Sequence, residues 1–235
     1  MIRTLDATLG RLVRHLLFLL VRFYYAVFYN VSASGKHLIT EHPGAIVLAT
    51  HVSRNDGPLL LSALYTCARM RPVVHYDEYH SALQWLPMFV ISAIPVSSPR
   101  RWAAERRAAW KDRQMRVIGK VLAAGNTVLL FPAGVSRQQP EEVVKPHFSG
   151  AYDMIRAHPN APVLLARIEG LGRFQTPRFD AFWTFIGRAK GRRHVAVEIT
   201  RLEGLSTDQP MAAFNAQLEA LLNRPIDMAP TSTPE

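Results

Sequence analysis

A histidine and an aspartate lie five positions apart in the segment HVSRND, residues 51–56. Histidine is the side chain best suited to accept a proton near neutral pH. An aspartate on its other ring nitrogen would fix the tautomer and stabilise the imidazolium that forms. Such a pair needs an incoming hydroxyl or water as the nucleophile. A bland explanation is also open, because Asp56 could cap the following helix and His51 could make an ordinary loop hydrogen bond.

Two further segments carry candidate binding residues. In FPAGVSRQ, residues 131–138, a proline and a glycine follow an apolar run, which predicts a tight loop with free backbone N–H groups. Arg137 could reach a phosphate from that loop. The segment HYDEYH, residues 75–80, holds two histidines and two carboxylates. Their spacing fits no standard metal site, and no metal is predicted.

Short apolar runs alternate with helical patterns along the chain, which predicts an α/β fold with a mixed, partly parallel β-sheet flanked by helices. The predicted strands are 44–50, 71–76, 90–97, 126–131, 161–170 and 193–200, and the predicted helices are 56–70, 81–89, 102–124, 149–158 and 211–222. Ligands of such sheets bind beyond the carboxyl ends of the strands. His51 and the loop after Phe131 both follow such ends, so we expect them at one edge of the sheet.

The first 35 residues differ from the rest, because they are apolar and aromatic but interrupted by Arg11, Arg14 and Arg22. This pattern predicts an amphipathic, membrane-associating helix followed by a turn-rich hinge at 32–36. A buried core helix and a cleaved signal peptide remain alternatives. The rest of the chain is predicted to form a single domain over 36–223 and a disordered tail over 224–235.

The charge balance favours a partner that presents phosphate. Lysine and arginine number 28 against 18 acidic residues, which gives a net charge of +10. Both an anionic membrane and a nucleic acid meet that requirement. The basic face of the predicted helix 102–124 could be simply solvated or could face an anionic leaflet. No motif that reads nucleic acid is present, and the aromatic residues cluster in the first thirty residues rather than among the arginines.

Four segments, residues 51–56, 94–101, 131–137 and 161–166, follow one another along the chain in an order that resembles a known family. They resemble the glycerolipid acyltransferases of the 1-acylglycerol-3-phosphate acyltransferase type, and the resemblance covers about 44–169. The family has a catalytic His-x4-Asp, which His51 and Asp56 match. The segment IPVSSPRR, residues 94–101, is similar to the second block, so the resemblance gives Arg100 or Arg101 a part in acceptor binding. In the family, the third block usually has the sequence Phe-Pro-Glu-Gly followed by an arginine. The residues that match it here are Phe131, Pro132, Gly134 and Arg137. The segment APVLLA, residues 161–166, resembles the fourth.

The resemblance implies an O-acyltransferase in which His51 takes the proton from the free hydroxyl of a lysophospholipid. That oxygen would attack the thioester of acyl-CoA or acyl carrier protein, with no metal or redox cofactor. The enzyme would sit on the cytoplasmic face of the inner membrane and bind its anionic surface but no nucleic acid. Ala133 stands where the family usually has glutamate, so the resemblance does not predict which headgroup the acceptor lipid carries. A non-catalytic membrane-binding homologue and a basic nucleic-acid-binding protein are the alternatives.

Overall fold

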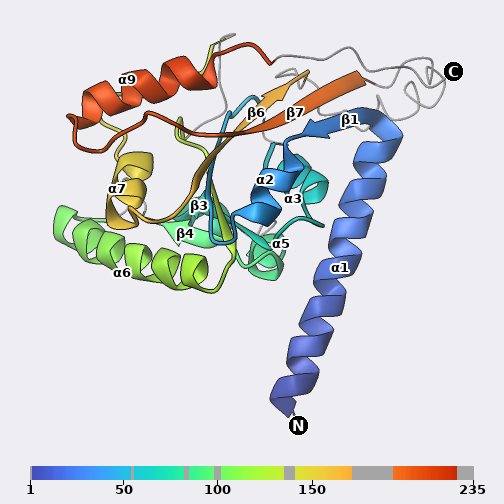
Figure 1. The fold of residues 1–235 in the computed structure, drawn as a ribbon. Coiled ribbons are helices and arrows are strands. Elements are labelled where there is room, and N and C mark those ends of the chain that lie inside the picture. Colours follow the sequence, from blue (N-terminus) through green and yellow to red (C-terminus); the bar gives the residue numbers. More distant parts are fainter. Residues whose placement is uncertain are drawn as a thin grey trace, which may run out of the picture.

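A computed structural model describes residues 2–53, 56–81, 85–97, 102–134, 141–170 and 193–226. The strands are β1 (Tyr29–Ser34), β2 (Ile46–Ala49), β3 (Met70–His75), β4 (Ile94–Val96), β5 (Thr127–Leu130), β6 (Val163–Glu169) and β7 (Arg193–Arg201). The helices are α1 (Ile2–Phe28), α2 (Lys36–Glu41), α3 (Asp56–Ala63), α4 (Tyr76–Tyr79), α5 (Trp85–Val90), α6 (Ala104–Ala123), α7 (Gly150–Ala157) and α9 (Met211–Leu222). Figure 1 shows these elements arranged around a twisted sheet.

The strands of the described residues form one seven-stranded sheet in the order β1-β7-β6-β2-β5-β3-β4. The pair β6–β7 is antiparallel, and the other neighbours are parallel. Strand β2 lies near the middle, and all four of its residues are buried. A strand with both faces covered needs a continuous apolar run, which is what residues 46–49 provide. The predicted mixed, partly parallel α/β fold is confirmed.

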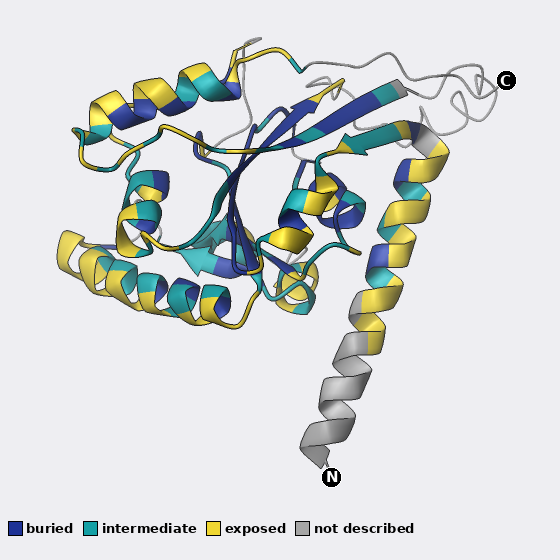
Figure 2. Ribbon diagram, viewed as in Figure 1, coloured by how far each residue is buried: buried dark blue, intermediate teal, exposed yellow. Residues whose placement is uncertain are grey.

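Helices cover both faces of the sheet, so the core has two halves. One half packs side chains of α1, α2 and α3 against the sheet, with Phe18, Ile39 and Leu60 among its buried members. The other half joins α6, α7 and α9 through Ile118, Met154 and Phe214. In Figure 2 the buried residues concentrate on the central strands and on the helix faces that meet them.

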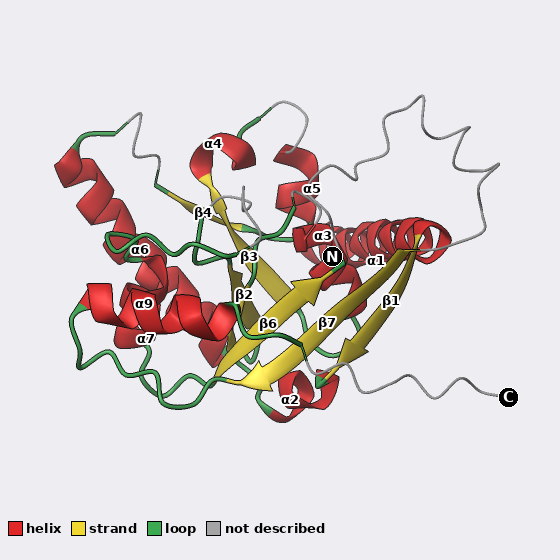
Figure 3. Ribbon diagram, turned by 90° about the horizontal axis from the view of Figure 1, so that it is seen from above, coloured by secondary structure: helices red, strands yellow, loops and turns green. Residues whose placement is uncertain are grey.

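The predicted hinge at 32–36 is wrong for most of its length, because residues up to Ser34 belong to strand β1. This strand pairs in parallel with β7 at the edge of the sheet, as the view in Figure 3 makes visible. The turn is confined to Gly35, whose φ is 70°. A Cβ there would lie 2.0 Å from the carbonyl oxygen of Ile199, so the position accepts only glycine. The small and polar residues of this segment are typical of a turn, so the sequence predicted a hinge. The segment forms a strand because it pairs with β7, which lies over 150 residues away and leaves no local signal in the sequence.

The helix predicted over 56–70 ends earlier, at Ala63, and residues 65–67 form a turn before β3. The short helix α2 was not predicted. Within the described residues, no helix combines the length and the apolar character that a membrane crossing requires. Helix α1 is present, but its association with a membrane stays a prediction. Residues 227–235 of the predicted tail lie outside the described residues, whereas Arg224 and Pro225 accept hydrogen bonds from Arg167.

Candidate active site

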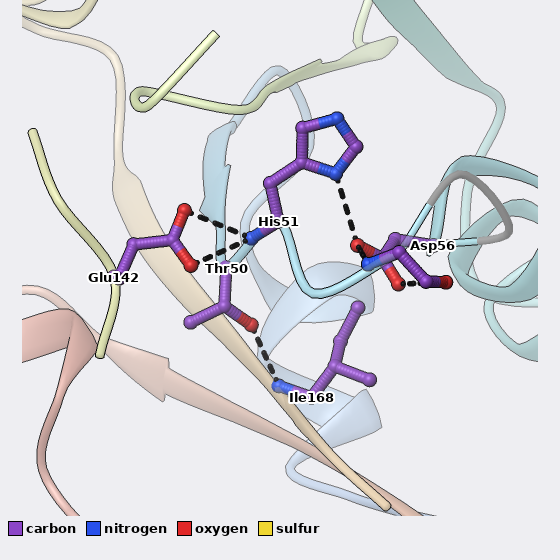
Figure 4. Close-up of polar contacts among 6 residues, drawn as sticks. Thr50, His51, Asp56, Glu142 and Ile168 are labelled. Carbon is purple, nitrogen blue, oxygen red and sulfur yellow. Dashed lines mark hydrogen bonds and ion pairs between the residues drawn. The ribbon is translucent and has the colours of Figure 1, made fainter. Parts of the chain in front are cut away.

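The site is built where β2 ends at the carboxyl edge of the sheet. Thr50 follows the strand, and its backbone N–H donates to the carbonyl of Ala166 at 3.0 Å. The Thr50 hydroxyl accepts from the N–H of Ile168 at 2.9 Å. These two bonds fasten the end of β2 to β6, and Figure 4 shows the bond between Ile168 and Thr50. His51 is therefore presented from a rigid strand end rather than from a free loop.

The structure brings His51 and Asp56 together. Nδ1 of His51 lies 3.0 Å from Oδ2 of Asp56. The carboxylate is fully buried, and it also accepts the N–H of Ser53 at 2.8 Å and the Ser53 hydroxyl at 3.0 Å. An ionised carboxylate can only accept, so Nδ1 must be the protonated nitrogen. The second ring nitrogen, Nε2, then carries a free lone pair and lies away from Asp56 (Figure 4).

The simple capping explanation of Asp56 does not describe these contacts. Asp56 is the first residue of α3, and its carboxylate turns back to Ser53 and His51. The N-terminus of α3 still helps, because the helix dipole favours a negative charge there. The arrangement can therefore orient an imidazole and stabilise its protonated form, which are the two tasks of the carboxylate in a His–Asp base.

His51 lies in the wall of a pocket of about 860 Å³. Most of the lining residues are apolar, and they come from α1, α3, α5, α6 and α7 and from the strands β3, β4 and β5; they include Phe18, Leu61, Met88, Met115 and Met154. The volume falls within the range of small-molecule sites. A mostly apolar pocket with a few polar groups is suited to a ligand with a long hydrocarbon part.

The loop after β5 forms part of the same wall. Phe131, Pro132 and Gly134 line the pocket, and the Phe131 ring centroid lies 4.6 Å from that of His51. Gly134 has a φ of 69°, which closes the tight turn that the sequence predicts. The expectation of free N–H groups is wrong at Gly134, because its N–H donates to the carbonyl of Phe131 at 3.0 Å. Pro132 has no N–H at all.

A model of the acyltransferase family matches residues 30–168, which is more than half of the chain. The chain belongs to the acyltransferase family. The matched segment runs from β1 to β6 and includes the His51–Asp56 pair and the loop 131–134. No curated protein sequence matches this acyltransferase.

A solved structure has a similar fold. It is the crystal structure of the 1-acyl-sn-glycerophosphate (LPA) acyltransferase PlsC from Thermotoga maritima, with a TM-score of 0.55 and 18% sequence identity. The alignment covers 88% of this chain and 78% of that chain. At this identity the likeness concerns the fold alone, which agrees with the mixed sheet flanked by helices described above.

The phosphate-binding predictions divide between described and undescribed residues of the acyltransferase. Arg100, Arg101 and Arg137 lie outside the described residues. Two other basic residues, Arg107 and Lys111, line the pocket from α6. Lys111 pairs with Asp153 at 2.5 Å. The sequence placed both cations on the basic face of this helix, but helical spacing alone could not show that they face a pocket.

Two residues near the acyltransferase site were missed by sequence reasoning. Both oxygens of Glu142 accept the backbone N–H of His51, at 3.1 and 3.0 Å. On α1, burial raises the pKa of the Tyr25 phenol, and Tyr24, Tyr29 and Asp56 add smaller effects in the same direction. Neither residue has a local signal, because both reach the site only through the tertiary fold.

Proposed function

We propose that this acyltransferase moves a fatty acyl group from acyl-CoA or acyl carrier protein to the free hydroxyl of a lysophospholipid. The observation that carries the proposal is the 3.0 Å contact between His51 Nδ1 and Asp56, with His51 in the wall of a large, mostly apolar pocket. The family match supports acyl transfer, and the pocket supports a lipid substrate. The name of the similar structure, an LPA acyltransferase, supports a lysophospholipid as the acceptor.

In the proposed step, Nε2 of His51 accepts the proton of the lysophospholipid hydroxyl. The oxygen bonds to the thioester carbonyl carbon, and the carbonyl π electrons move to its oxygen. When the tetrahedral intermediate collapses, the C–S bond breaks, and the imidazolium returns the proton to the departing thiolate. The products are a two-chain phospholipid and a free thiol. The step needs neither an acyl-enzyme nor a metal or redox cofactor.

Acceptor binding is proposed for the basic residues around the pocket. Arg107 is half-buried in the pocket lining, where it could pair with a lipid phosphate through two hydrogen bonds. Arg100, Arg101 and Arg137 remain proposed phosphate ligands from their place in the matching motifs. Pro132 and Gly134 are proposed to shape the wall against which the acceptor lies.

Membrane association is proposed from the exposed side of α1. Its apolar residues fall into two sets on opposite faces. Phe18 and Tyr25 are buried against the domain. The exposed set consists of Leu12, Val13, Leu16, Leu19, Leu20, Phe23 and Val27. At 100° per residue these seven fall within about 120° of the helix circumference and extend roughly 22 Å along it. A continuous apolar stripe of this kind marks an interaction surface, and an interfacial helix binds lipid through such a face.

Helix α5 adds further exposed apolar side chains near the same helix. Trp85, Leu86 and Phe89 are all more than half exposed, and α5 contacts α1. A bilayer beneath both helices would place the pocket next to the lipids that it binds. We propose the cytoplasmic face of the cell membrane, where acyl-CoA and acyl carrier protein are found.

An acyl-transfer assay with a panel of lysolipids tests the proposal. The purified protein is mixed with acyl-CoA or acyl carrier protein and with lysolipids of different headgroups, and the products are identified by mass spectrometry. We expect a two-chain phospholipid together with an equal amount of free thiol. Thiol release without acylated lipid would instead identify a thioesterase, and no product with any acceptor would favour a non-catalytic membrane-binding protein.

A further inference from the structure

Glu142 is a buried carboxylate that the proposed mechanism does not use. Its side chain and backbone are fully inaccessible to solvent. Both carboxylate oxygens accept the backbone N–H of His51, at 3.1 and 3.0 Å (Figure 4). Burying a carboxylate is costly unless hydrogen bonds compensate for the lost water. Because the fold buries a carboxylate next to His51 despite this cost, we expect Glu142 to have a role at His51.

The position of Glu142 is fixed from a part of the fold that does not carry Asp56. Its backbone N–H donates to Oδ1 of Asn223 at 2.7 Å, and its carbonyl accepts from Nδ2 of Asn223 at 2.9 Å. Asn223 directly follows α9. Two residues further on, the N–H of Val144 donates to Glu219 of the same helix at 2.7 Å. Helix α9 thus holds the segment 142–144 in place.

His51 is consequently held at two points by two separate carboxylates. Asp56, from α3, binds the imidazole, whereas Glu142, fastened to α9, binds the main chain. His51 has already left the β-ladder, so its N–H has no strand partner. The bond to Glu142 supplies one. Fixing the main-chain N–H fixes the direction in which the Cα–Cβ bond leaves the backbone, and with it the place of the ring.

We infer that Glu142 is a positioning residue for His51, which it holds so that Nε2 faces the pocket while Nδ1 donates to Asp56. The inference rests on the proposed function for its kinetic test but not for its structural one. Glu142 does not touch the substrate, so its loss should slow the chemical step without weakening substrate binding. Ala133 leaves the loop after β5 without its usual carboxylate, and Glu142 brings one to the site from nine positions later.

The test compares Glu142→Leu with Glu219→Leu. Leucine is close to glutamate in size but has no accepting oxygen, so the His51 N–H loses both of its acceptors. Glu219→Leu makes the same change in the same clamp, at a bond that does not reach His51. For folded Glu142→Leu we expect kcat to fall roughly 10- to 100-fold, as for a slightly misplaced catalytic group, with unchanged KM values. We expect Glu219→Leu to keep kcat within about threefold of the wild type.

A second readout does not depend on activity. Proton–nitrogen NMR of the His51 ring is expected to show the Nδ1–H tautomer in the wild type and in Glu219→Leu, and a mixture of tautomers in Glu142→Leu. Equal losses of kcat in both variants would overturn the inference, because they would show that only the clamp matters. An unchanged tautomer with unchanged kcat in Glu142→Leu would also overturn it. If the wild type transfers no acyl group, the proposed function fails, and the NMR comparison still decides the role of Glu142.

Discussion

The substitution Asp56→Asn tests the negative charge beside the imidazole with little change in shape. The carboxylate of Asp56 accepts three hydrogen bonds at 2.8 to 3.0 Å: Nδ1 of His51 and the N–H of Ser53 both donate to Oδ2, and the Ser53 hydroxyl donates to Oδ1. An asparagine has one accepting oxygen, and its NH2 group can only donate. An asparagine oxygen in the place of Oδ2 keeps the bond from Nδ1, and the NH2 group in the place of Oδ1 donates to the Ser53 hydroxyl. The tautomer is then kept, but the negative charge that stabilises the imidazolium is lost.

The expected loss comes from the change of charge alone. In the serine proteases, replacing the orienting aspartate by asparagine lowers kcat by about 10⁴-fold because the imidazole takes the wrong tautomer. With the tautomer kept, we expect a smaller fall in kcat of roughly 10²- to 10³-fold, which corresponds to about 2.7 to 4 kcal/mol of transition-state stabilisation. Because Asp56 does not line the pocket, the KM values should change little.

The assay follows thiol release from acyl-CoA and the formation of the two-chain lipid. Circular dichroism and thermal unfolding must show that the variant is folded. Ser53→Ala serves as the control, because it removes one hydrogen bond to the carboxylate and leaves the bond to His51. We expect it to retain kcat within about tenfold, the effect of one hydrogen bond of about 1 kcal/mol. Folded Asp56→Asn with kcat within tenfold of the wild type would refute the reasoning.

Three further predictions follow from burial and exposure. Ala133 is only 3% exposed, so Ala133→Glu should lower the free energy of unfolding by about 3 kcal/mol, measured by urea denaturation. The acceptor preference of the variant protein that still folds should shift toward lysophosphatidic acid. Wild-type stability would contradict the burial argument. Arg107→Ala should raise KM for the acceptor about tenfold with kcat unchanged, the loss of roughly one charge-assisted hydrogen bond, and an unchanged KM would exclude this residue from phosphate binding. Replacing Leu16, Leu20 and Phe23 with serine should weaken binding to anionic vesicles at least 100-fold in a flotation assay, because each replacement removes about 1.5 kcal/mol or more of apolar burial. The control is the same replacement of three polar, exposed residues on α2, Lys36, His37 and Thr40. Equal losses of binding in both variants would count against α1 as the membrane contact.

The fold could be predicted because its main signals are local. The buried strand at 46–49 is a short apolar run, and the helix over 211–222 shows its periodicity within its own residues. Strand β1 was missed because it is polar and needs β7 as its partner. Local composition cannot show that such a partner exists.

The site was predicted in part for the same reason. His51 and Asp56 lie on either side of a strand-to-helix turn, so their spacing in the sequence predicted their proximity in space. Glu142 is separated from His51 by 91 positions, and its contact depends on how the segment 142–144 is held by α9. Arg107 was recognised as part of a basic helix face, yet which side of that face meets the pocket depends on the packing of α6.

The central claim is that the imidazole of His51 removes the proton from the acceptor hydroxyl. Single-turnover acyl transfer by His51→Ala measures this most directly, with His37→Ala as the control, because His37 is exposed on α2 and does not line the pocket. Both variants should fold and bind vesicles like the wild type. We predict that His51→Ala retains less than about one thousandth of the wild-type rate and that His37→Ala retains all of it. A folded His51→Ala protein that turns over within tenfold of the wild type would contradict the account.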